Sequence, residues 1–194
     1  MSTRADRRPA YPPPTGLVTA VGVLMALWCV GFAAVSVWIE ATDHFADGEY
    51  ADYASGFSVA NWLVTVIKVG GSVLALLAVA RRPRFPGPGV VGTLLWAAFA
   101  TTGIYVLGSL VQAVLMLTGQ AGDADRIDGA AVAYVALFAL AAVGFGVLAV
   151  SYARRAGLGN KELALGAIGA PILLGGLLVA LPALLVALGL FPAS

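Results

Sequence analysis

The sequence predicts an all-α integral membrane protein, a bundle of five transmembrane helices. Two features of composition lead to this fold class: 60% of the 194 residues are hydrophobic and only 11% are charged, whereas a soluble domain is about 25% charged. The mean hydropathy is +0.93. The third observation is that five apolar stretches are long enough to cross about 30 Å of hydrocarbon. Membrane barrel strands are about 10 residues long and alternate in polarity, so they do not fit these stretches.

The predicted spans cover residues 16–39, 57–80, 90–117, 130–152 and 163–190. They form a single membrane domain, 16–194. Residues 1–15 precede it as a basic, proline-rich lead that we expect to be disordered and cytoplasmic. Pro171 and Pro182 both lie in the last span. Each proline removes a backbone hydrogen bond, so we expect two kinks there, which either curve the helix around its neighbours or serve a moving gate.

Local signals mark the ends and the contacts of several spans. The segment 81–89, RRPRFPGPG, is interrupted by prolines and predicts a tight, non-helical turn between the second and third spans. Asp128 before the fourth span predicts a helix N-cap, because a carboxylate accepts hydrogen bonds from the free amides there. Three pairs of small residues four apart have a spacing that favours close approach of another helix: Gly71 and Ala75, Ala142 and Gly146, and Gly166 and Ala170.

The basic residues indicate the orientation. Nine of them precede the first span or follow the second and fourth, and Arg126 alone lies in the opposite loops. The positive-inside rule then places the N-terminus in the cytoplasm and the C-terminus outside. Arginine outnumbers lysine, and alanine and glycine are abundant, which favours a GC-rich bacterial genome and hence the bacterial cytoplasmic membrane. The nine residues are Arg4, Arg7, Arg8, Arg81, Arg82, Arg84, Arg154, Arg155 and Lys161.

The composition argues against several classes of function. The net charge is +1 and no basic stripe is present, so no nucleic-acid partner is predicted and lipid is the expected surrounding. His44 is the only histidine and Cys29 the only cysteine, so no metal site and no cofactor are predicted. No span carries an acid–base pair, which makes an enzyme less expected than a non-catalytic protein. The loop 40–56 is acidic and aromatic, but its sequence identifies no ligand.

Lys68 is the one charged residue inside a predicted span. A lysine at the centre of a membrane helix costs about 2.5–3.5 kcal/mol on insertion scales. Its stem can lift the amine toward water, but from this depth it hardly reaches the interface. Glu40, the nearest acid, lies about two turns too shallow to neutralise it. Three interpretations remain: a neutral amine, a bound anion or anionic headgroup, and a carboxylate on another chain.

Polar residues form one stripe on each of two neighbouring spans. The stripes are Asn61, Thr65, Lys68 and Ser72 in the second span, and Thr101, Tyr105, Ser109 and Gln112 in the third. Their helical spacing places each set on one face. In an antiparallel pair, residues at equal depth have a constant sum of residue numbers, which pairs Lys68 with Tyr105. We therefore expect the stripes to face each other as a polar site. Alternatively, the hydroxyl groups bond to carbonyls of their own helix.

Two functions follow from these features. The first is a non-catalytic accessory or structural subunit of a bacterial membrane complex, in which Lys68 meets an acid of another subunit or the chain associates with itself. The alternative is a homo-oligomeric transporter or channel for an anion or small solute, with Lys68, Tyr105, Asn61 and Gln112 along the path. A lipid-modifying enzyme ranks third, because it would need an acid–base pair.

Overall fold

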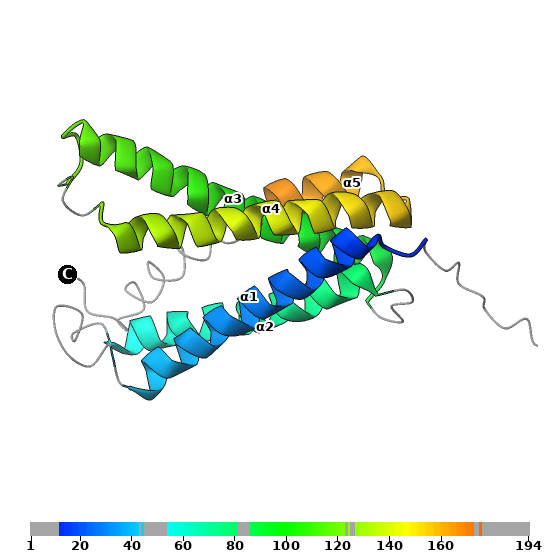
Figure 1. The fold of residues 1–194 in the computed structure, drawn as a ribbon, viewed down its shortest axis with the longest axis horizontal. Helices are drawn as coiled ribbons and strands as arrows, with labels where there is room; N and C mark the ends of the chain where they lie inside the picture. Colours follow the sequence, from blue (N-terminus) through cyan, green and yellow to red (C-terminus); the bar gives the residue numbers. More distant parts are fainter. Residues whose placement is uncertain are drawn as a thin grey trace, which may run out of the picture.

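The computed structural model describes residues 12–42, 44, 54–80, 86–122, 124, 127–172 and 175. This part of the chain is helical and contains no strand (Figure 1). Its four long helices are α1 (Gly16–Ala41), α2 (Ala54–Val79), α3 (Pro88–Leu117) and α4 (Gly129–Ala156). Each predicted span from the first to the fourth is therefore confirmed as a helix, with ends that differ by at most a few residues. The predicted lead falls mainly on residues 1–11, which lie outside the described part.

The four long helices have the length and composition of membrane spans. The shortest apolar stretch, Gly56–Val79, has 24 residues and measures about 36 Å at 1.5 Å per residue. Large aliphatic side chains are exposed along all four helices, among them Leu27, Val66, Leu107 and Val143. Apolar surface of this extent marks contact with lipid or with another protein. The described part of the chain is therefore all-α, with four helices long and apolar enough to cross a membrane.

A fifth helical segment follows α4 and supports the predicted count of five helices. It consists of α5 (Asn160–Ala164), the π-helical turn η3 (Leu165–Gly169) and helical backbone up to residue 172. Pro171 lies two residues after the last residue of the π turn. Because proline has no N–H, the regular hydrogen bond to the carbonyl four residues earlier is absent, and helices depart from regular geometry at such places. Pro182 and most of span 163–190 lie outside the described residues, and the kinks at Pro171 and Pro182 both stay predictions.

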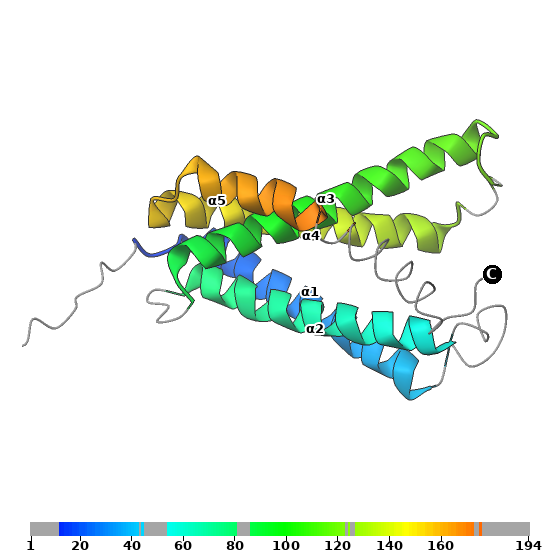
Figure 2. The ribbon, with the colours of Figure 1, turned by 180° about the vertical axis from the view of Figure 1, so that it is seen from behind.

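The long helices form two antiparallel hairpins. α1 packs along α2, and α3 packs along α4. The hairpins contact each other at the end where α1 and α3 begin, here called the joined end, and diverge toward the splayed end (Figures 1 and 2). Met25, Ala75, Leu95 and Leu148, one residue from each helix, are at most 1% exposed. All four lie in the halves nearest the joined end, so the packed core is there.

Asp128 confirms the predicted N-cap of α4. Its side chain accepts a hydrogen bond from the amide of Ala131 at 2.8 Å, which satisfies one of the free amides at the helix start. The other end of α4 is closed by Gly157, whose φ of 63° is left-handed. Glycine adopts this conformation without a steric penalty, and such a residue commonly ends a helix.

We expect Asp128→Ala to loosen the first turn of α4. Loss of a capping side chain costs about 1 kcal/mol, which corresponds to about fivefold faster amide exchange if this turn opens locally. Hydrogen–deuterium exchange of residues 129–133 measures the effect. Asp128→Asn is the matched control, since asparagine caps helices equally well. Equal exchange rates in the alanine variant and the unmodified chain would show that the cap is dispensable.

Candidate functional site

Lys68 points to α1. Its Nζ donates hydrogen bonds to Oγ of Ser36 at 2.7 Å and to the carbonyl oxygen of Phe32 at 3.3 Å. The ring centroid of Phe32 lies 5.7 Å from Nζ, within the range of a cation–π contact. Ser36 is buried, whereas Lys68 remains partly exposed. The prediction that Lys68 faces Tyr105 on α3 is therefore wrong: the groups that bind its ammonium belong to α1.

A second polar layer lies about one turn further toward the splayed end. The amide nitrogen of Asn61 donates to the carbonyl oxygen of Ser36 at 2.9 Å and to Oε2 of Glu40 at 3.0 Å. The hydroxyl of Ser58 donates to the other carboxylate oxygen of Glu40. Together Ser36, Glu40, Ser58, Asn61 and Lys68 form what we call the α1–α2 polar seam. Within the part of the chain that the structure describes, no carboxylate forms an ion pair with Lys68.

The other two residues of the α2 stripe are Thr65 and Ser72. Thr65 is buried, and its hydroxyl donates to the carbonyl of Asn61, four residues earlier, at 2.7 Å. This is the bond within one helix that the alternative interpretation of the stripe predicted. Ser72 lies partly buried on the joined side of Lys68. Thr65 thus satisfies its hydroxyl within α2 and does not bond across to α3.

The α3 stripe is directed to α4 and to the outer surface. The ring of Tyr105 packs on Phe138 of α4, with centroids 4.4 Å apart. Ser109 donates to the carbonyl of Tyr105 at 2.9 Å, again within one helix. Thr101 is partly buried, and Gln112 is exposed. The structure therefore does not bring the two predicted stripes together.

An aromatic cluster connects the two stripes indirectly. Phe32, which contacts the ammonium of Lys68, lies 5.6 Å from Phe138 between ring centroids. Phe138 in turn contacts Tyr105. Tyr134 closes the cluster, with its ring 5.0 Å from Phe138. The lysine and the tyrosine that the sequence paired by depth are thus separated by two phenylalanine rings.

Close packing of α1 on α2 explains why the seam forms at this interface. A Cβ atom on Gly22 would lie 2.6 Å from a methyl group of Val79, and one on Gly71 would lie 3.1 Å from the sulfur of Cys29. Glycines at such contacts let two helix backbones approach each other. This approach brings the carbonyl of Phe32 within reach of the Lys68 side chain.

Sequence reasoning missed Ser36, Glu40 and Ser58. Ser36 and Glu40 are four residues apart on α1, and Ser58 and Asn61 are three apart on α2, so both pairs have the spacing of one helix face. The depth of Glu40 excluded it as a direct partner of Lys68, and the structure has no such ion pair. Comparing the depths of residues in the predicted spans did not reveal that Asn61 could bridge between Glu40 and the backbone of Ser36.

We expect Asn61→Leu to weaken the α1–α2 hairpin, because Glu40 and the carbonyl of Ser36 each lose a donor. Hydrogen bonds between membrane helices contribute about 0.6 kcal/mol each on average, so the free energy of unfolding should fall by about 1 kcal/mol. Gln112→Leu, which removes an exposed amide on α3, should change it by less than about 0.5 kcal/mol. Unfolding with sodium dodecyl sulfate in mixed micelles measures both. Equal stability of the two variants would contradict a stabilising role of the seam.

The α1–α2 polar seam can bind a hydrogen-bond acceptor through the ammonium of Lys68. An ammonium has three N–H donors, and two of those on Lys68 bond to α1. The described residues contain no group of three histidine, cysteine, aspartate or glutamate side chains placed to hold a metal ion.

The chain matches no family model, and comparison with curated proteins and with solved structures found no match.

Proposed function

We propose that this chain is a non-catalytic accessory or structural subunit of a membrane complex in the bacterial cytoplasmic membrane. Its N-terminus lies in the cytoplasm and its C-terminus outside, as the distribution of basic residues predicts. Lys68 binds an acidic side chain on a helix of a second subunit. One observation carries this proposal: among the described residues, the ammonium of the partly exposed Lys68 bonds only to uncharged oxygens.

The electrostatics of the seam support an external partner. The hydroxyl of Ser36 and the carbonyl of Phe32 satisfy two donors of Lys68, and no carboxylate of the described residues pairs with its charge. The carboxylate of Glu40 is about one turn away and is bonded to Ser58 and Asn61. A carboxylate from a second chain would form a charge-assisted hydrogen bond with the remaining donor, and such bonds are about twice as strong as neutral ones.

The surface beside Lys68 is suited to contact with another helix. Val64, one turn earlier on the same face of α2, is 42% exposed, and the adjacent Ile67 is 49% exposed. A side of α2 that exposes aliphatic side chains next to the lysine can pack against a helix of a partner.

Native mass spectrometry tests the proposal directly. The chain is tagged at its own locus and extracted gently with lipid, and a second polypeptide at fixed stoichiometry is the expected result. A photoreactive amino acid in place of Val64 should cross-link that polypeptide, whereas the same group in place of the exposed Val143 on α4 should not. A closed homo-oligomer without a second polypeptide would overturn the subunit proposal, and anion flux in liposomes would then test the transport alternative.

A further inference from the structure

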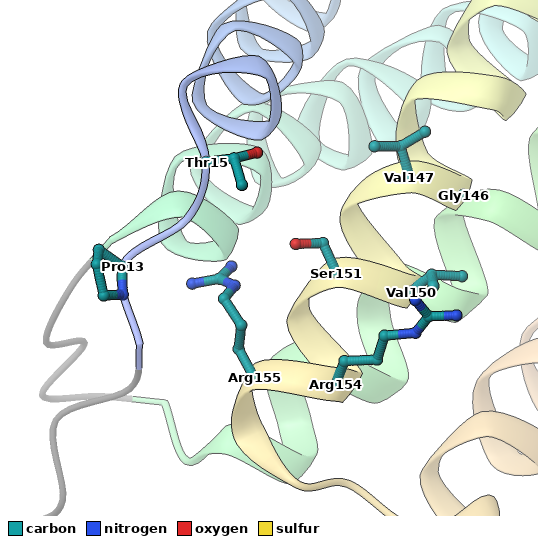
Figure 3. A pocket seen from close by; sticks show the side chains of 8 residues that line it. All are labelled: Pro13, Thr15, Gly146, Val147, Val150, Ser151, Arg154 and Arg155. Atoms are coloured by element: carbon teal, nitrogen blue, oxygen red, sulfur yellow. The ribbon is translucent and has the colours of Figure 1, made fainter.

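A cavity at the joined end combines two arginines with an apolar wall. It has a volume of about 600 Å³ and lies between the residues that lead into α1 and the second half of α4 (Figure 3). Pro13 and Thr15 line one side, and Ser151, Arg154 and Arg155 line another. No carboxylate is among the lining residues, so two positive charges border this space without an acid of the described chain beside them.

Arg155 is only partly satisfied by the protein. Its Nη2 donates to the carbonyl oxygen of Ala78 near the end of α2, and the ring of Tyr152 lies 5.7 Å from the guanidinium carbon. Its Nε and Nη1 are buried and have no hydrogen-bond partner among the residues that the structure describes. Figure 3 shows the side chain extending from α4 toward Pro13 and Thr15. Arginine stays protonated in proteins, and a buried charged donor without an acceptor is unfavourable, so this site calls for an anion.

The geometry of the donors selects the type of anion. A guanidinium presents its N–H groups in a planar fork that matches two oxygens of a phosphate. Arg154 adds a second guanidinium to the cavity lining, and Ser151 adds a hydroxyl. Figure 3 shows the Arg154 side chain directed away from Arg155, so Arg154 adds positive charge to the site, and the phosphate accepts its hydrogen bonds from Arg155 and Ser151.

We propose that this cavity binds the phosphate group of an anionic membrane lipid, with Arg155 as the principal contact. Gly146, Val147 and Val150 continue the lining along α4 away from the arginines, which suits the apolar part of a lipid beyond its headgroup. The cavity lies where four helices long enough to span a membrane come together, the level at which headgroups are found. This inference does not depend on a partner for Lys68.

Lipid titration followed by native mass spectrometry tests the site on the full chain in detergent micelles. We expect phosphatidylglycerol to bind at least about tenfold more tightly than phosphatidylcholine. Arg155→Gln should reduce the affinity for phosphatidylglycerol by at least about tenfold, since it removes a charged, bidentate donor. Lys161→Gln is the matched control: it removes an exposed positive charge outside the cavity and should leave the affinity unchanged.

Three results with the unmodified chain and Arg155→Gln would overturn the proposal. One is unchanged binding by Arg155→Gln, and another is equal affinity for the two lipids. The third is full displacement of the lipid by millimolar inorganic phosphate, which would assign the cavity to a free anion. Arg155 also bonds to α2, so Arg155→Gln could fail to fold. Ser151→Leu therefore serves as a second variant: it fills the cavity, keeps both arginines and should weaken lipid binding equally, and unchanged binding by the folded variant would also refute the site.

Discussion

If Lys68 binds a partner subunit as proposed, Lys68→Met is expected to release that subunit while the chain itself stays folded and becomes more stable in isolation. Methionine replaces the lysine stem and removes a charge that costs about 2.5–3.5 kcal/mol within a membrane helix. The two oxygens of Ser36 and Phe32 that lose their hydrogen bonds to the ammonium can bond to each other instead. Ser36 lies four residues after Phe32, so its hydroxyl can donate to the Phe32 carbonyl that Lys68 vacates.

The partner cannot compensate in the same way. Its carboxylate would remain buried without a counter-ion, and breaking a buried pair from one side costs about 3–5 kcal/mol. The affinity between subunits should therefore fall by at least about a hundredfold. Quantitative mass spectrometry of the tagged complex measures the ratio of the two polypeptides, and thermal denaturation of the isolated chain measures its stability.

Two control variants separate assembly from folding. Lys68→Arg keeps the charge and should retain a measurable fraction of the complex, and Gln112→Leu should retain all of it. Wild-type recovery of the partner with Lys68→Met would refute the proposed contact. If Lys68→Met instead unfolds the isolated chain, the lysine serves to hold α1 and α2 together. Loss of anion flux in an intact homo-oligomer would favour transport.

The lengths of the helices could be predicted from the sequence. The helix that supplies the hydrogen-bond acceptors of Lys68 could not. Apolar length and the cap at Asp128 depend on neighbouring residues, so they are visible in a linear pattern. Matching residue numbers placed Lys68 and Tyr105 at one depth, but depth does not determine which neighbour a face meets. The close approach of α1 at Gly22 and Gly71 decides this, and that packing depends on residues some fifty positions apart.

The fifth helical segment shows the same difference between what a local pattern predicts and what packing between distant residues decides. The small pair Gly166 and Ala170 predicted a close helix contact, and Gly166 is buried. Nothing in the pair indicated that its neighbour would be α3 or that a π turn would form there. Pro171 offered a local reason for distortion, but the sequence does not specify which residues before a proline adopt the wider turn.

Gly166→Val is the substitution that we expect to destabilise the fold most. A Cβ atom at this position would lie 2.6 Å from Cβ of Trp96 and 3.1 Å from the backbone nitrogen of Ala97, and it would collide with the carbonyl oxygen of Thr93. The fifth segment would have to move away from α3. We expect a loss of about 3 kcal/mol in the free energy of unfolding, measured by sodium dodecyl sulfate titration in mixed micelles.

The reason for this large effect is that a backbone contact has no flexible atom that can yield. Gly144 is the informative contrast, because the three atoms nearest to a Cβ there all belong to the side chain of Met25, which can adopt another rotamer. Gly144→Ala should therefore cost less than about 1.5 kcal/mol. Gly103→Val, on the same helix as Thr93 but with no atom within 4 Å of its Cβ position, should change stability by less than about 0.5 kcal/mol. If Gly166→Val and Gly103→Val unfold alike, the fifth segment does not pack on α3 through Gly166.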